Sequence, residues 1–423
     1  MIYLILIISS LICCYISVKK MKIWLNHYTL YTIFSLGTLL LYAFNPIFKV
    51  HEYTITLLLL GTFSFNVSII LFYNVSFSLR GVTKNYINYR KPFWLLIITI
   101  ILLVPFVITF KNQLNSGFEL WYIRRILTTD DLRSSFEKTI WLYYLSPVSI
   151  MLTVLSYYKF YNKKYPTQLL FFASIVITII LSFVDGGGRT GLMRWFYIYM
   201  IMLVYKKGRF SKYINDCAVF KWYYFALPVA AGIIITAMRA ITNDDNSFIM
   251  ALTESFTIYI GMFDYYLYNS HLITELYTCG ISSLENIYLL INMLVRTFGG
   301  PDYIGNYKIV DDIIQNNVIL NNGQVYNAYV SMYFRFYRDA GVFGIILGPM
   351  FLSSFLTILY KLACNNTFYI LIYVFSLSLC TGLNQELVFS KVYYFLFLLY
   401  MIILKDITFS KSHHIRNTKS FMI

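Results

Sequence analysis

Residues 93–110 read FWLLIITIILLVPFVITF, an apolar run without a single charged side chain. About 20 apolar residues in a helix cross the ~30 Å hydrocarbon core of a bilayer, so this run predicts a membrane-spanning helix. Comparable runs recur along the 423-residue chain, which is 59% hydrophobic and only 13% charged. Soluble domains average roughly 25% charged residues. The composition therefore excludes a disordered, a collagen-like and an ordinary cytosolic protein.

The apolar runs together predict an all-α fold, a polytopic transmembrane helix bundle of eleven spans. The spans are expected at 2–18, 25–44, 53–73, 93–110, 139–158, 168–184, 190–205, 220–238, 341–360, 367–384 and 388–404. The first run is not expected to be a cleavable signal peptide, because its basic cluster follows it instead of preceding it. Spans 1–8 then fall in residues 1–239, a large loop in 240–339, spans 9–11 in 340–405, and a cytoplasmic tail in 406–423.

The positions of the charges predict the orientation, because Lys and Arg concentrate on the cytoplasmic side of a membrane. With the amino terminus outside, most of the 34 basic residues lie in inner segments and most of the 19 acidic residues lie in outer ones. The net charge of +15 is then a topology signal beside anionic lipid, and we expect no nucleic-acid partner. The carboxyl terminus is predicted to be cytoplasmic.

The predicted outer segment 240–339 is too long to be without structure, which indicates a functional and partly helical loop. Its apolar stretches 248–268 and 284–298 predict helices that lie at the interface or pack over the bundle; a reentrant or spanning hairpin is the alternative. The first stretch carries a polar stripe at helical spacing, formed by Thr253, Thr257, Gly261 and Asp264.

A glycine-rich turn, DGGGRTG at 185–191, connects the sixth and seventh predicted spans on the outer side. Its glycines permit close backbone approach, and amides just before a helix favour anions. The planar guanidinium of Arg189 suits phosphate. The turn lacks the spacing of a nucleotide-binding phosphate loop, so nucleotide hydrolysis is not expected. The structural alternative is an interfacial turn whose arginine extends toward the lipid headgroups.

Further outer arginines lie near the predicted ends of apolar helices. These are Arg194, Arg239, Arg296, Arg335 and Arg338. Arginines at helix ends are often lipid anchors or partners of the helix dipole. The outer face otherwise avoids positive charge, so arginines gathered there point to an anionic, lipid-linked ligand.

A third pattern leads from the long loop into the ninth predicted span, with YNAY at 326–329 and YRDAGVFG at 337–344. Read structurally, it contains an Arg–Asp pair and small residues for helix packing. N-x-Y followed by Y-x-D-x-G-x-x-G, together with the glycine–arginine turn, resembles the Wzy-type polymerases of O-antigen and capsule repeat units. The resemblance covers the architecture loosely along most of the chain, and the motifs only at 185–194 and 326–344.

The resemblance implies a glycosyltransferase of the bacterial inner membrane that acts on the periplasmic side. The donor would be a glycan on undecaprenyl pyrophosphate, and the acceptor would be the non-reducing end of a new lipid-linked repeat unit. A chain-length regulator protein is an implied partner. We expect no nucleotide sugar, no cofactor and no metal.

Two sets of residues fit this chemistry. Arginines can stabilise the charge that develops on the departing pyrophosphate, and a general base is needed for the acceptor hydroxyl. The substrate-binding candidates are Arg189, Arg239 and Arg338, then Arg296 and Arg335, with Asn327 and Tyr337 of the motifs. The candidate bases are Asp339, Glu254, Asp264 and His271. Outer tyrosines could stack on sugars, but the sequence offers no basis for choosing among its 40.

Three other functions remain open. A flippase for the same lipid-linked unit would be expected to have an even number of spans and both termini inside. An O-antigen ligase would also use an outward-facing site. A purely structural membrane protein is the third alternative. The sequence does not indicate which sugars or which linkage are involved.

Overall fold

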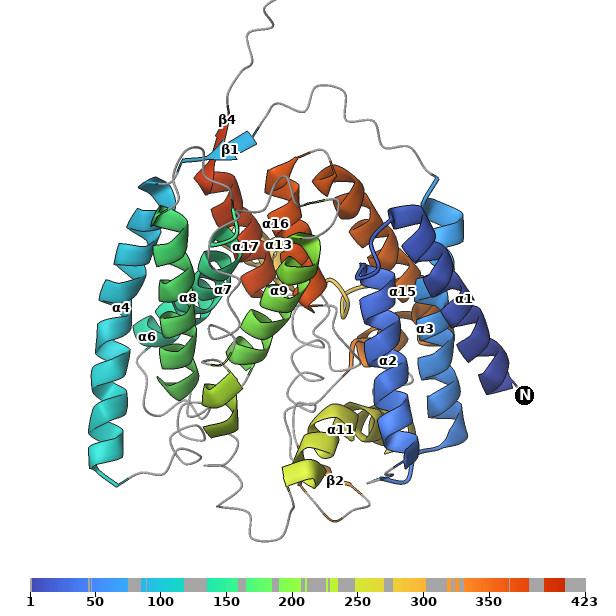
Figure 1. Ribbon diagram of the computed structural model, residues 1–423. Coiled ribbons are helices and arrows are strands. Elements are labelled where there is room, and N and C mark those ends of the chain that lie inside the picture. The colour runs from blue at the N-terminus through green and yellow to red at the C-terminus, as the bar shows by residue number, and fades with distance from the viewer. Residues whose placement is uncertain are drawn as a thin grey trace, which may run out of the picture.

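The computed structural model describes most of the helical part of the chain (Figure 1). The described residues are 2–44, 46, 48–74, 85–88, 90–117, 135–158, 165–184, 190–206, 210, 226, 229–234, 248–269, 277–301, 318–320, 323, 325–326, 331–364, 366–379 and 392–407.

Helices occupy the positions of the predicted spans, except that 220–238 lies largely outside the described residues. The helices are α1 (Ile2–Met21), α2 (His27–Phe44), α3 (Glu52–Phe72), α4 (Arg90–Asn115), α6 (Ser135–Ile140), α7 (Ser146–Leu155), α8 (Tyr165–Val184), α9 (Thr190–Lys206), α11 (Phe248–Asn269), α13 (Glu285–Thr297), α15 (Met332–Ala363), α16 (Thr367–Leu379) and α17 (Val392–Leu404). A π-helical turn, Trp141–Leu145, joins α6 to α7. The short strands are β1 (Asn85–Ile87), β2 (Val318–Ile319), β3 (Val325–Tyr326) and β4 (Lys405–Ile407).

In the described part of the chain, four helices are long and apolar enough to cross a membrane: α1, α3, α4 and α15. Shorter apolar helices occupy several of the other predicted positions. The protein is therefore a mostly helical membrane protein, and the total of eleven spans stays a prediction.

The helices pack in two groups (Figure 1). Helices α1, α2 and α3 pack with α15, although α15 comes much later in the chain. Helices α4, α7, α8 and α9 form the second group. Helix α16 contacts α15 in the first group and α9 in the second, so it joins the two.

Small and hydroxyl-bearing side chains line the interface between α3 and α15. A Cβ on Gly61 would lie 2.1 Å from the ring of Tyr333, so only glycine lets this ring approach α3. The Tyr333 hydroxyl is hydrogen-bonded to that of Tyr31. Deeper in the same group, His27 Nε2 lies 3.1 Å from the Thr357 hydroxyl. Small residues and polar contacts of this kind hold helices together where lipid supplies no hydrophobic driving force.

One end of the bundle gathers segments that the sequence predicts to be cytoplasmic. Strand β1 pairs with β4 in antiparallel fashion at the upper end in Figure 1. The ammonium groups of Lys20 and Lys361 lie 5.4 and 5.0 Å from the ring centre of Tyr73. These contacts bring the ends of α1, α3 and α15 together at one end of the bundle. Which end faces the cytoplasm stays a prediction.

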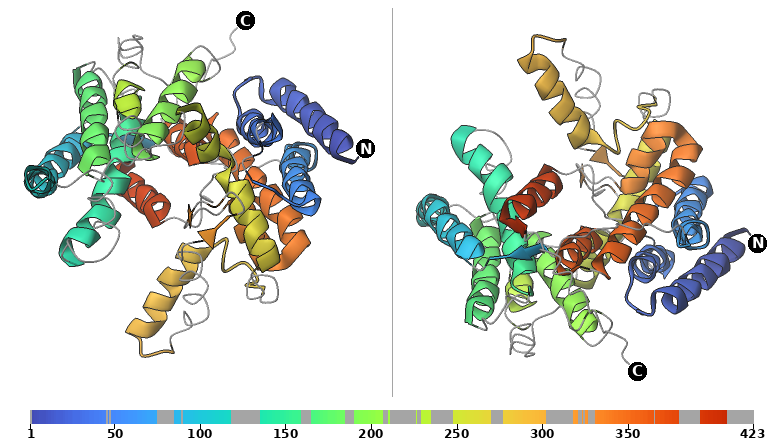
Figure 2. Two further views of the ribbon diagram at one scale, coloured as in Figure 1. Left: turned by 90° about the horizontal axis from the view of Figure 1, so that it is seen from below. Right: turned by 90° about the horizontal axis from the view of Figure 1, so that it is seen from above.

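At the opposite end, α11 lies across the ends of α2 and α3 (Figures 1 and 2). The predicted polar stripe faces the protein, because Thr253, Thr257 and Asp264 are all buried. A Cβ on Gly261 would lie 3.0 Å from the ring of Phe48, so this glycine lets Phe48 pack on the helix. The segment is therefore a helix packed over the bundle. Helix α13, also predicted, projects outward from the body in Figure 2.

Helix α15 begins earlier than predicted, at Met332 instead of 341, because the Ser331 hydroxyl caps it by accepting a hydrogen bond from Phe334 N at 3.3 Å. Its helical geometry stops at Ala340 and Gly341, which we call the α15 break. Gly341 has φ +59° and ψ −135°, a conformation that side-chain-bearing residues rarely adopt. The preceding residues, predicted as loop, thus form a short helix that folds back onto the rest of α15.

Candidate functional site

Asp339 immediately precedes the α15 break and anchors the segment before α13. Its Oδ1 accepts hydrogen bonds from the Thr278 hydroxyl at 2.5 Å and from Ser282 N at 2.9 Å. Its Oδ2 accepts one from Ser283 N at 2.9 Å. A carboxylate that accepts hydrogen bonds from backbone amides just before a helix also interacts favourably with the positive end of the helix dipole. Asp339, a predicted base, is thus engaged in holding residues 278–283 against α15.

The arginines of the motif are close to this anchor. Arg335 Nη1 lies 2.5 Å from Glu285 Oε2 and donates to Ser282 O at 3.3 Å. Arg338 is only 1% exposed, so its positive charge lies inside the protein. Arg296 is exposed at the end of α13.

Four predicted residues lie outside the described part of the chain: Arg189, Arg239, His271 and Asn327. Glu254 belongs to α11, but its side chain is outside the described part as well.

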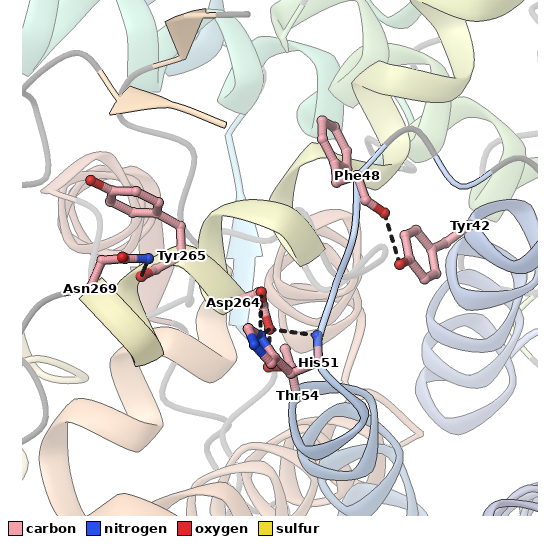
Figure 3. Close-up of polar contacts among 7 residues, drawn as sticks. All are labelled: Tyr42, Phe48, His51, Thr54, Asp264, Tyr265 and Asn269. Atoms are coloured by element: carbon pink, nitrogen blue, oxygen red, sulfur yellow. Dashed lines mark hydrogen bonds and ion pairs between the residues drawn. The ribbon is translucent and has the colours of Figure 1, made fainter. Parts of the chain in front are cut away.

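Asp264 pairs with a histidine that the sequence analysis did not select (Figure 3). Its Oδ1 accepts hydrogen bonds from His51 N at 3.0 Å and from the Thr54 hydroxyl at 2.6 Å. Its Oδ2 lies 3.1 Å from His51 Nδ1. The side chain of Asp264 is 9% exposed and that of His51 is 58% exposed. An ionised carboxylate can only accept hydrogen bonds, so Nδ1 is the donor in this contact, and in the neutral imidazole Nε2 then keeps its lone pair.

The local chain explains why His51 is held so firmly. His51 is the residue that caps the start of α3, with φ −70° and ψ 146°. The Asp264 charge is favourable there because it faces the amino-terminal end of the helix dipole. Just upstream, the Tyr42 hydroxyl donates to Phe48 O at 3.0 Å (Figure 3). The backbone of His51 is thus fixed while its ring remains accessible.

Tyrosines connect this pair to the α15 break. The His51 ring stacks on Tyr268, with ring centres 3.7 Å apart. Tyr337 lies within electrostatic range of Tyr53, Tyr268 and Tyr277, and the Tyr277 hydroxyl lies at the α15 break, 2.7 Å from where a Cβ on Gly341 would be. We call Tyr53, Tyr268, Tyr277 and Tyr337 the tyrosine cluster.

Three members of the cluster are accessible. Tyr53, Tyr268 and Tyr277 are 44%, 46% and 52% exposed. Partial burial and the Asp264 carboxylate raise the pKa of Tyr268. Tyr337 comes from the predicted motif, but the other three could not be chosen from the sequence. They lie on three separate segments that only the fold brings together.

The Asp339 anchor yields a direct prediction. We expect Asp339→Ala to raise the hydrogen-exchange rate of the Ser282 and Ser283 amides by about 10–100-fold, because a lost buried partner costs ~1–3 kcal/mol. Mass spectrometry of the exchanged full-length protein measures this. Glu285→Gln serves as the control. It removes the nearby ion pair with Arg335 but leaves the hydrogen bonds from the Ser282 and Ser283 amides to Asp339. Unchanged exchange in Asp339→Ala would show that the carboxylate does not hold the segment.

Comparison with known proteins gave no matching family model, no matching curated protein and no matching solved structure. Across the described ranges, no three His, Cys, Asp or Glu side chains come together as a metal site would require. The groups available for chemistry at this end of the molecule are an accessible imidazole, the carboxylates and arginines around it, and aromatic faces.

Proposed function

We propose that the chain is a polymerase of undecaprenyl-pyrophosphate-linked oligosaccharide repeat units, of the kind that build O-antigen or capsule. It would act as a glycosyltransferase in the bacterial inner membrane, with its site on the periplasmic side. It would transfer the growing glycan to the non-reducing end of a new lipid-linked unit.

One observation supports this proposal most. The described parts of the long segment between the eighth and ninth predicted spans fold back onto the helix ends. They bring the Asp264 carboxylate within 3.1 Å of His51 Nδ1 and the Glu285 carboxylate within 2.5 Å of Arg335 Nη1. Helix α11, which carries Asp264, lies at the end of the molecule opposite the paired strands β1 and β4 (Figure 1). An enzyme whose substrates hang from the outer leaflet needs a polar site of this kind beside the membrane.

The arginines are proposed to stabilise the negative charge that the reaction leaves on the departing diphosphate. Breaking the bond to undecaprenyl pyrophosphate leaves a diphosphate whose negative charge must be stabilised. Arg189 and Arg338 are proposed for this, with Arg239, Arg296 and Arg335 as further members of the set. The energy for transfer is already stored in the sugar–diphosphate bond, so no nucleotide is required at this face.

The glycan profile of a deletion strain tests the function. Without a polymerase, the cell should carry single repeat units, attached to lipid A where the glycan is an O-antigen, and the wild-type gene should restore long polymer. A ligase deletion would instead leave long polymer unattached. A flippase deletion would leave no units on the outer side, and a reporter at the amino terminus would then be found inside.

A further inference from the structure

We propose that His51 is the general base of this transfer, that Asp264 positions it, and that the tyrosine cluster beside it holds the acceptor sugar. This inference rests on the proposed function. It assigns the proton transfer to a residue outside the motifs and selects four of the chain's 40 tyrosines for sugar binding.

The geometry of His51 suits a base. Asp264 lies 3.1 Å from Nδ1 and fixes the tautomer that leaves Nε2 unprotonated. The side chain is 58% exposed, so Nε2 can reach a substrate while the backbone stays tied to Asp264. When the imidazole gains a proton, the adjacent carboxylate stabilises the resulting positive charge. Asp264 is therefore a positioning residue.

The chemical step can be written in full. The acceptor hydroxyl oxygen attacks the anomeric carbon of the donor, forming the new C–O bond. The bond between that carbon and the pyrophosphate oxygen breaks, and its electron pair leaves with undecaprenyl pyrophosphate. The hydroxyl proton passes to His51 Nε2 and is later lost to water. No other reactant is consumed.

The tyrosine cluster suits a sugar ring in particular. A tyrosine offers an apolar ring face together with a polar hydroxyl, and a sugar offers an apolar C–H face together with hydroxyls. Three of the four rings are largely accessible. Tyrosines that only anchor a protein in lipid headgroups act singly in a belt. Here Tyr268 stacks on His51, and Tyr337 lies within electrostatic range of Tyr53, Tyr268 and Tyr277, so the four side chains gather beside the base.

The test uses the full-length protein in lipid nanodiscs, with the lipid-linked repeat unit that accumulates in the deletion strain. We expect His51→Gln to lower the turnover rate by about 10²–10⁴-fold with little change in the acceptor Michaelis constant. This variant keeps the backbone bond to Asp264, and hydrogen exchange of α3 checks its fold.

Asp264 and the tyrosines are tested separately. Asp264→Asn should slow the reaction and change its pH profile, and the double variant with His51→Gln should be no slower than His51→Gln alone. Tyr268→Ala should raise the acceptor Michaelis constant by roughly two- to tenfold. Tyr143→Ala is the matched control, because Tyr143 is 45% exposed but lies in the other helix group.

The outcomes separate the two proposals. If the deletion strain makes normal polymer, the proposed function fails. If it accumulates single units but His51→Gln polymerises them at the wild-type rate, only the assignment of the base fails. An Asp264→Asn protein that reacts at the wild-type rate also overturns that assignment, even if His51→Gln does not fold. An unchanged Michaelis constant in Tyr268→Ala shows that the cluster is a lipid belt.

Discussion

Cells that carry Arg338→Ala should make single repeat units only, while the variant protein still inserts into the membrane. Arg338 is 1% exposed and precedes Asp339, whose carboxylate anchors the segment before α13. Its charge is thus buried one residue after Tyr337, a member of the tyrosine cluster. In a low-dielectric setting such a charge acts on a developing diphosphate across several ångströms. Loss of one stabilising group of this kind typically lowers the rate by about 10²–10³-fold.

Two further substitutions separate the effect of the Arg338 charge from the effect of its packing. Arg338→Lys keeps the charge but not the planar donor arrangement, so we expect it to retain part of the polymer. Arg338→Gln keeps much of the volume without the charge and should behave like Arg338→Ala. Arg90→Ala, an exposed arginine at the start of α4, is the control. Gel profiles of the glycan, with immunoblots of the membrane fraction, measure all four. Normal polymer length in Arg338→Ala would remove Arg338 from the site, and Arg189→Ala tests the other arginine in the same way.

The second large effect is expected on stability. A Cβ on Gly344 would lie 1.8 Å from the backbone oxygen of Phe336, across the α15 break. Backbone cannot yield as a flexible side chain can, so Gly344→Ala must separate the two parts of α15. Overpacking of a core usually costs about 1–3 kcal/mol, and we expect this substitution to lie at or above the top of that range.

The measurement is the thermal unfolding of the detergent-solubilised protein, together with its abundance in membranes. Gly37→Ala in α2 is the matched control, because a Cβ there would meet no atom within 4 Å. Replacing glycine by alanine inside a helix normally stabilises it by ~0.5–1 kcal/mol. The unfolding temperature is therefore expected to fall in Gly344→Ala and to rise in Gly37→Ala. A Gly344→Ala protein as stable as the wild type would mean that the two parts of α15 are not in close contact.

The helices could be predicted from the sequence because each depends on a local property, an apolar run long enough for a membrane. The polar stripe of α11 could be predicted for the same reason. The early start of α15 was missed because the Ser331 cap and the Gly341 break are short features inside a polar stretch. The partner of Asp264 could not be predicted, since His51 lies 213 residues away. The tyrosine cluster depends on how the fold brings four separate segments together, so composition alone could not reveal it.

The packing of α15 against the first three helices has a consequence for biogenesis. Ser68 is bonded to Ser353, 285 residues later, and Tyr31 to Tyr333, 302 residues later. While the ribosome is still translating the intervening chain, the hydroxyls of α2 and α3 have no such partners in the bilayer. Contacts between residues this far apart in the sequence form late in folding, and until then the surfaces that make them are exposed and prone to aggregation. The amino-terminal helices can therefore complete their packing only after α15 has been synthesised and inserted.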